Sequence, residues 1–415
     1  MTEAMAELLN KERRVKVFEK SFTQQESIPE QGIAAAIEVM RSGRLHRYNT
    51  LPDEKSETDL LELEFADYQG VPYCLACSSG GYALHVAMRA AGVQAGDKVL
   101  CNAFTLAPVP GAIHNSGAVP VLVDVADDYC IDLDDLESKA DASGAKYLML
   151  SHMRGHLADM DRIMAICERF GLFLIEDCAH TMGASWNGRK SGTFGDVACF
   201  SAQTYKHINS GEGGFLTTRH PEVMARAIMH SGSYMLFERH FSAPPPETFE
   251  QIRYQTPNYS GRMDNLRAAI LRPQIADLDS QCERWNQRYR LIEQTLADCA
   301  SVSIPARPEA EHFVGSSIQF SLPQFNVEQI QAVVERCAER GVVLKWFGDA
   351  VPRDYTSRYD SWRYIQEMPQ LPKTEQILST LLDMRIPLTF SEQDCTLIAE
   401  IIVEVAAEVA EESQP

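Results

Sequence analysis

Residues 73–82 have the sequence Tyr-Cys-Leu-Ala-Cys-Ser-Ser-Gly-Gly-Tyr. The apolar residues 73–76 predict a short buried strand, and the small residues 77–81 predict a turn. An apolar helical pattern follows over 82–91. A strand that leads through a turn into a helix is typical of a βα unit, so this stretch predicts an α/β fold with a mainly parallel sheet.

The same alternation continues along the chain. Further strands are predicted over 98–101, 119–125, 147–151, 173–176, 197–200 and 214–217, and helices over 33–40, 59–68, 108–116, 133–139 and 160–170. Strands this apolar are covered by helices on both faces of the sheet. In such sheets the ligand lies at the carboxyl ends of the strands.

The rest of the chain is less regular. Residues 1–25 predict a polar, partly helical lead-in, 44–57 a surface loop, and 236–257 a long irregular Pro-rich loop. A long helix is predicted over 263–289, followed by strands at 318–322 and 342–346 and helices at 327–340 and 395–411. We therefore expect three parts: a lead-in (1–29), a large domain (30–275) and a small C-terminal α+β domain (276–415).

Composition excludes several classes of protein. The chain has 415 residues and a net charge of −20, which argues against binding to nucleic acid. No apolar run approaches the roughly 18 residues of a membrane span, and the charged start lacks a signal-peptide core. Eleven scattered cysteines are typical of reduced thiols. The expectation is a cytoplasmic enzyme.

Three features lie at the predicted strand ends. Gly80 and Gly81 open a helix whose free N–H groups could bind an anion, although a plain βα turn looks the same. Asp177 closes a strand, where it could pair with a protonated ring nitrogen or simply cap a helix. Lys206 lies between a strand and the Gly-rich loop 211–214, as a carbonyl-reactive amine or as a surface charge.

In this order, the small-Gly turn, the run Glu-Asp-Cys-Ala-His at 176–180, the pattern Cys-Phe-Ser-x-x-x-x-Lys at 199–206 and Gly-Glu-Gly-Gly at 211–214 resemble the DegT/DnrJ/EryC1/StrS aminotransferases. The likeness covers most of 30–275. Its other matching positions are 33–43, Phe65, Gly70, Gly96, Asp97, 103–105, 117–120, Val123, Asp124, His152, Gly155, 158–161, Gly188, Gly192, Gly195, Asp196, Arg262, Met263, Leu266, Ala268 and Ala269.

The resemblance implies a fold-type I transferase that depends on pyridoxal 5'-phosphate (PLP) and acts mainly on keto-sugars. Lys206 then corresponds to the lysine that holds PLP as a Schiff base and serves as the base for the proton shift. Asp177 corresponds to the partner of the pyridinium nitrogen, and His180 and Phe104 to residues over the ring. The expected phosphate-binding positions are Gly80, Gly81, Tyr82 and Ser201. The resemblance also implies glutamate or glutamine as the amino donor, and a homodimer with shared active sites.

Some positions depart from the family pattern. Gly81 stands where Thr or Ser is common, and Gln203, Thr204 and Tyr205 replace the usual residues before the lysine. The family's Asn-x-Arg-Met segment, which reaches the neighbouring subunit's phosphate, has two extra residues here, between Asn258 and Arg262. Asn258 is therefore only a candidate cofactor contact.

The substrate is less clear from the sequence. The segment 344–362 resembles transaminases that make 8-amino-3,8-dideoxy-octulosonate, an aminated form of the lipopolysaccharide sugar Kdo. An Arg or Lys there could meet a substrate carboxylate. Alternatives are a nucleotide-sugar aminotransferase of antibiotic or O-antigen pathways, a PLP-dependent sugar dehydratase or eliminase, and a non-catalytic regulator with this fold.

Other motifs favour ordinary structural roles. The Cys-x-x-Cys of Cys74 and Cys77 lies along a predicted strand, where alternation separates the two thiols. His152 and His156 have metal-like spacing but lie in a loop with no obvious third ligand, and His152 could instead line the substrate site. The aspartates at 124–135 lack the glycine and terminal glutamate of a calcium loop. No G-x-G-x-x-G follows a strand, which disfavours a dinucleotide reductase. We predict no metal site.

Overall fold

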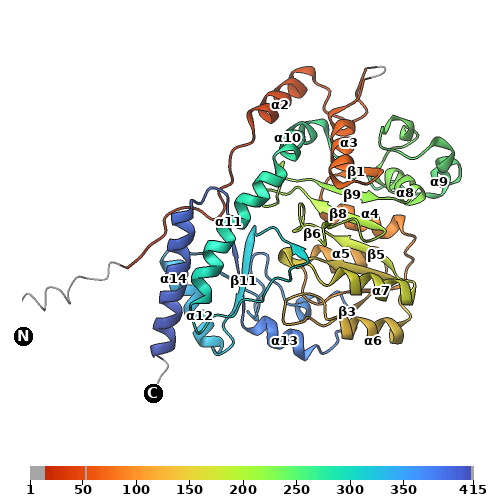
Figure 1. Cartoon of the computed structure of the whole chain (residues 1–415). Coiled ribbons are helices and arrows are strands. Elements are labelled where there is room, and N and C mark those ends of the chain that lie inside the picture. The colour runs from red at the N-terminus through yellow and green to blue at the C-terminus, as the bar shows by residue number, and fades with distance from the viewer. Residues whose placement is uncertain (1–14, 52–53, 413–415) are drawn as a thin grey trace, which may run out of the picture.

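The computed structural model describes residues 15–51 and 54–412. Its centre is a seven-stranded sheet in the order β1-β9-β8-β5-β4-β2-β3 (Figure 1). Its strands are β1 (Tyr73–Cys77), β2 (Lys98–Asn102), β3 (Val119–Val123), β4 (Tyr147–Ser151), β5 (Phe173–Asp177), β8 (Val197–Ser201) and β9 (Gly214–Thr218). Only β9 runs against its neighbours. The carboxyl ends of the other six strands therefore share one edge.

Helices cover both faces of this sheet. On one side lie α3 (Glu57–Gln69), α6 (Leu133–Ser143), α7 (Met160–Phe170) and α10 (Asn265–Ala276), and on the other α4 (Gly80–Ala90), α5 (Pro108–Asn115) and α8 (Pro221–Ser231). Alternate residues of β1 show the division, because Cys74 and Ala76 pack in one core cluster and Leu75 and Cys77 in the other. The predicted α/β class and doubly covered sheet are confirmed.

The C-terminal part has its own core. The strands β11 (Ser317–Ser321), β12 (Lys345–Trp346) and β13 (Leu381–Arg385) form an antiparallel sheet in the order β11-β13-β12. The helices α11 (Leu278–Ala297), α12 (Val327–Glu339) and α14 (Glu392–Glu412) pack beside it, as Figure 1 shows at the lower left. The segment 359–371 returns to the large sheet, where Trp362 packs in the same cluster as Ile113. The predicted domain boundaries at 29/30 and 275/276 stay predictions.

The remaining elements are short or peripheral. They are α2 (Glu30–Ser42), the 3-10 turns η1 (Met153–Gly155), η2 (Phe237–Arg239), η3 (Pro246–Thr248) and η4 (Tyr359–Ser361), α9 (Phe249–Gln255), α13 (Pro372–Ser379), and the small sheet of β6 (Ser185–Trp186), β7 (Arg189–Lys190) and β10 (Glu311–His312). No helix within the described ranges is both long enough and apolar enough to cross a membrane.

Two predictions of local structure were wrong in part. The long helix over 263–289 is two helices, α10 and α11, which meet at Asp277. Pro273, which lacks an N–H and disturbs the preceding turn, comes shortly before this break. The Pro-rich segment 236–257 contains the helix α9, held by Phe249 stacked on Phe237 with ring centroids 4.4 Å apart.

The predicted lead-in lies partly outside the described residues. Residues 15–25 contain no helix. Instead Phe18 and Phe22 pack edge-on against Phe390 of the C-terminal part, with ring centroids 4.9 and 5.0 Å away. Burial of these two rings fixes the segment without a helical pattern.

The predicted surface loop at 44–57 is also anchored internally. Arg47 is only 2% exposed and forms ion pairs with Asp59 and Glu62 of α3. A buried, ion-paired arginine holds a loop firmly, because breaking the pair leaves an uncompensated charge. Polar composition alone did not reveal this anchor.

Candidate active site

A cavity of about 450 Å³ opens at the carboxyl ends of β4, β5 and β8, beside the start of α4. Six of the nine predicted site residues line it: Gly80, Gly81, Asp177, His180, Ser201 and Lys206. The structure thus brings together three sequence features that lie up to 126 residues apart (80 to 206). This is the edge at which parallel sheets bind ligands.

Lys206 is a half-buried amine in this cavity. Its Nζ lies 2.8 Å from Nε2 of His180. Burial lowers the pKa of Lys206 to about 7, with a further contribution from the positive charge of Arg154, while Asp177 opposes the shift. Burial also lowers the pKa of His180 well below its usual value, so its neutral ring can accept a hydrogen bond from the amine. A lysine with such a pKa is partly neutral at pH 7 and can attack a carbonyl.

Asp177 ends β5 and is buried under the cavity. Its Oδ1 accepts a hydrogen bond from the N–H of Ala179 at 3.2 Å, and its Oδ2 accepts one from Oγ of Ser151 at 3.1 Å. Burial raises the pKa of Asp177, and the nearby Lys206 counteracts that shift. No helix begins after Asp177 in this part of the described chain, so the helix-cap interpretation is wrong.

The start of α4 forms a small cradle beside Ser201. Ser79 caps the helix by accepting the N–H of Tyr82 at 3.1 Å. The helix begins at Gly80, whose own N–H has no partner within the helix. A Cβ at Gly80 would lie 2.8 Å from Cβ of Ser201, whereas one at Gly81 would meet nothing nearer than Pro108 at 3.6 Å. Close backbone approach therefore requires glycine at position 80 but not at 81.

Three predicted site residues do not line the cavity. Tyr82 points its hydroxyl to the carbonyl of His230 at 3.0 Å. Phe104 is 2% exposed and packs edge-on against Phe347 at 4.8 Å. Asn258 is exposed, and its Oδ1 accepts the N–H of Ser260 at 2.8 Å. Their predicted contacts with the cofactor stay predictions.

Residues 26–403 match the model of the DegT/DnrJ/EryC1/StrS aminotransferase family. The chain belongs to this family. Members are PLP-dependent, so PLP is its cofactor.

Individual relatives agree with that assignment. The chain is 33% identical to a putative L-glutamine:3-amino-2,3-dideoxy-scyllo-inosose aminotransferase of Micromonospora echinospora, over 64% of this chain and 60% of the relative. It is 28% identical to a pleiotropic regulatory protein of Geobacillus stearothermophilus, over 88% and 92%. The matches span about three fifths of the first curated relatives.

The fold is shared with solved structures. The crystal structure of 3-amino-5-hydroxybenzoic acid synthase superposes with a TM-score of 0.81, at 24% identity, over 95% of this chain and all of the other. At this identity the likeness establishes the fold. The expected fold type I is confirmed.

The cavity of this aminotransferase-family chain fits PLP chemically. The open helix start and Ser201 offer donors for a phosphate, Asp177 offers a buried carboxylate for a ring nitrogen, and Lys206 offers a reactive amine. These groups come from the ends of three strands of the same sheet edge: the start of α4 follows β1, Asp177 ends β5, and Ser201 and Lys206 end and follow β8.

Several cavity residues were missed from the sequence. They include Ser151, Arg154, Tyr205, Ser316, Tyr355 and Arg385. Ser151 closes β4, so the strand-end rule could have found it. Arg385 ends β13 in the small sheet, and nothing local to its sequence shows that this strand faces the large domain.

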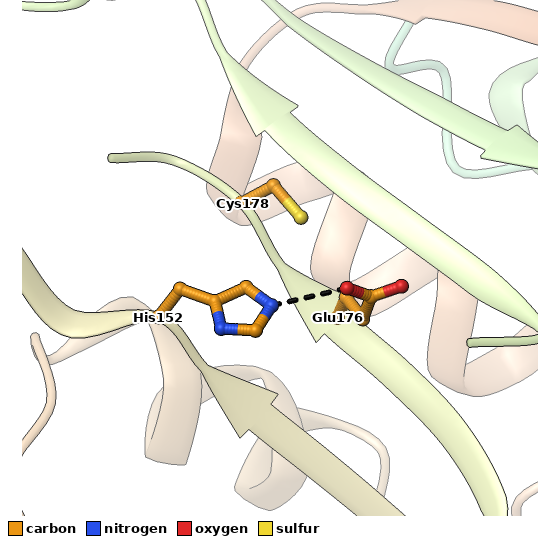
Figure 2. Close-up of side chains that lie close together, drawn as sticks. All are labelled: His152, Glu176 and Cys178. Carbon is orange, nitrogen blue, oxygen red and sulfur yellow. Dashed lines mark hydrogen bonds and ion pairs between the residues drawn. The ribbon is translucent and has the colours of Figure 1, made fainter. Parts of the chain in front are cut away.

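His152, Glu176 and Cys178 form a buried group of potential metal ligands next to the cavity (Figure 2). Both carboxylate oxygens of Glu176 are already used, because Gly195 N–H donates at 2.6 Å and Gly192 N–H and His152 Nε2 lie at 3.0 Å. Burial raises the pKa of the Cys178 thiol, which disfavours the thiolate that a metal needs. The group fits a structural brace better than a metal site.

The other motifs also have structural roles. Nε2 of His156 lies 2.8 Å from Oε1 of Gln319, and His156 is not part of the group of potential metal ligands that contains His152. Cys74 and Cys77 are buried free thiols on opposite faces of β1, and burial raises the pKa of both. A redox role would need a low pKa and access to solvent.

The lowered pKa of Lys206 predicts how PLP loading depends on pH. Only the neutral amine attacks the aldehyde, so the loading rate should rise about tenfold per pH unit below pH 7 and level off above about pH 8. Stopped-flow absorbance after mixing the PLP-free protein with PLP measures this. A rate that keeps rising to about pH 10, as for an ordinary lysine, would contradict the proposed burial of the amine.

Proposed function

We propose that this protein is a PLP-dependent aminotransferase that moves an amino group from glutamate or glutamine to a keto-sugar. The observation that carries this proposal is Lys206, whose pKa of about 7 makes it reactive in the same cavity as the buried carboxylate of Asp177. Family membership supports the same reaction class.

Each residue has a defined task in this proposal. Gly80, Gly81 and Ser201 would hold the phosphate, and Asp177 would keep the ring nitrogen protonated. PLP, when bound, supplies an electron sink for the substrate carbon that loses its proton. Lys206 would link the cofactor, be displaced by the donor, and then carry a proton on Nζ from the substrate carbon to the cofactor. His180 orients that amine through the 2.8 Å contact.

The proposal includes a homodimer with shared active sites. Exposed apolar side chains lie on α2 and on two loops: Ile33, Ile37, Met40, Leu45, Leu51, Tyr234, Met235, Leu236 and Phe241. The two loops contact each other, because Arg239 Nη1 donates to the carbonyl of Tyr48 at 2.6 Å. A second copy that buries these side chains would make a symmetric dimer, and the proposal assigns Asn258 of each copy to the phosphate site of the other. A monomeric mass in sedimentation equilibrium would contradict this arrangement.

The finer proposal concerns the acceptor, an 8-oxo-Kdo-type sugar acid of lipopolysaccharide biosynthesis. The segment whose sequence suggested it places Asp354, Tyr355 and Ser357 on the cavity wall. The cavity must also hold PLP, which favours a monosaccharide over a nucleotide sugar. All eleven cysteines are free thiols, which supports a reducing, cytoplasmic location.

Two other classes of function make different predictions. A dehydratase or eliminase would bind PLP but would not exchange its amino group with glutamate. A regulator, as the name of the Geobacillus relative suggests for that protein, would have no need of a reactive lysine. Lys206 and Asp177 together favour the aminotransferase.

A half-reaction tests the proposal directly. Purified protein with PLP should show the visible absorbance of lysine-bound cofactor, and glutamate or glutamine should convert it to the shorter-wavelength amino form within seconds to minutes. A keto-sugar acceptor should restore the original spectrum. If neither donor changes the spectrum, amino transfer from these donors is excluded.

A further inference from the structure

Arg154 has an unusual backbone and an unusual environment. Its φ is +54°, in the left-handed region that residues other than glycine rarely adopt, and it stands between His152 and Gly155 in η1. The residue is only 8% exposed and lines the active-site cavity. Backbone strain of this kind persists where the surroundings enforce it, and it is concentrated at functional sites.

The guanidinium of Arg154 is held in place from two sides. Its Nη2 lies 3.0 Å from Oδ2 of Asp383, and the group lies over the ring of Phe347 at 5.8 Å. Neither Nε nor Nη2 makes a well-formed hydrogen bond. Oδ1 of Asp383 already accepts from Gln319 at 2.7 Å. Arg154 therefore lines the cavity with one ion pair and no well-formed hydrogen bond, which leaves its guanidinium with donor capacity for an anion.

Two more cations lie close by. Arg385 lines the same cavity, with its guanidinium 3.5 Å from the ring centroid of Tyr205. The Nζ of Lys345 is buried without a hydrogen-bond partner, and burial together with Arg154 and Arg385 lowers its pKa to about 8. Asp383 is the carboxylate that pairs with this group, and Asp354 at the cavity wall adds a second negative charge. The cluster therefore has more positive than negative charge.

We propose that Arg154, supported by Arg385 and Lys345, binds a carboxylate of the amino acceptor and selects acidic sugars as substrates. This inference rests on the proposed amino transfer. In such a reaction the donor leaves before the acceptor enters the same cavity. Arg154 and Arg385 then line the space that the acceptor enters, and a neutral sugar would leave the excess positive charge of the cluster uncompensated, which is costly.

The geometry favours one carboxylate over a diphosphate. A cavity of about 450 Å³ that must also hold PLP leaves room for a sugar-sized molecule. A guanidinium binds carboxylate and phosphate alike, so the size of the cavity is what favours a monosaccharide acid here. Tyr355 and Tyr205 offer faces and hydroxyls for the rest of a sugar.

Binding measurements on the PLP-loaded protein test this assignment without turnover. Kdo itself, which has no amino group to react, and its neutral methyl ester are titrated calorimetrically. Kdo should bind at least about 10-fold more tightly than the ester, and Arg154→Gln should abolish that difference while leaving affinity for the ester within about twofold. Arg353→Gln, an exposed arginine on the neighbouring loop, is the matched control and should bind like the parent.

Further variants distinguish a lost anion site from a misfolded protein. Because Arg154→Gln leaves Asp383 unpaired, the pair Arg154→Gln/Asp383→Asn is measured too, and Arg154→Lys should restore part of the preference for the acid. All variants must keep the absorbance of lysine-bound PLP.

Equal loss of acid and ester affinity, unchanged acid affinity in Arg154→Gln, or tighter binding of UDP-glucose than of Kdo would overturn the assignment. The half-reaction of the unsubstituted protein with glutamate is measured as a separate experiment. Its failure would refute amino transfer, whereas the binding results alone decide the anion site.

Discussion

Lys206→Ala is expected to lower the rate of amino transfer by at least about 10³-fold, because one side chain supplies both the covalent link and the moving proton. Proton transfer by a positioned side chain alone contributes about 10²–10⁴-fold. The amine of Lys206 is prepared for both tasks by its lowered pKa and by its 2.8 Å contact with His180. Single-turnover kinetics with glutamate, followed by absorbance, measure the loss.

The spectrum and a control lysine make this result specific. The variant should lose the visible band of lysine-bound cofactor while keeping its thermal midpoint. Lys190→Ala is a matched control, because Lys190 is also partly buried with a lowered pKa but lies over the ring of Tyr68, outside the cavity. It should retain activity and spectrum. Full activity in Lys206→Ala would refute the assigned role.

Most of the site residues that the sequence could predict lie at the ends of strands. Asp177, Ser201 and Lys206 follow or close short apolar strands, and a parallel sheet necessarily brings such ends to one edge. β4 and α7 were predicted with their exact bounds, because clear apolar patterns were flanked by turn residues. In β4 and α7 the local sequence pattern therefore predicts the same element that the overall fold contains.

The parts that were missed depend on tertiary packing. Arg154 owes its place in the cavity to a left-handed backbone and to Asp383, which is 229 residues away (154 to 383). The anchoring of Phe18 and Phe22 on Phe390 likewise joins the two ends of the chain. No short-range sequence pattern encodes such contacts. The predicted contact of Asn258 with the phosphate of a neighbouring subunit stays a prediction.

Asp177→Asn is the second substitution with a large expected effect. The amide cannot offer a negative charge to a protonated ring nitrogen, so the electron sink weakens, and amino transfer should slow by about 10²–10⁴-fold, as for other proton-coupled groups. Stability should change little, because burial already raises the pKa of Asp177 and an asparagine Oδ1 can still accept from Ala179 or Ser151.

The adjacent carboxylate provides the contrasting control. Glu176 points away from the cavity and accepts hydrogen bonds from the backbone of Gly192 and Gly195. Glu176→Gln leaves one of these donors facing an NH₂ group, so the free energy of unfolding should fall by about 1–3 kcal/mol. Its effect on the chemical step should be small by comparison. The two substitutions, although adjacent on one strand, should therefore have different effects: the one at Asp177 should slow catalysis, and the one at Glu176 should lower stability. Denaturant titration alongside single-turnover kinetics measures both, and a slow chemical step in both variants would argue that Asp177 acts only through the fold.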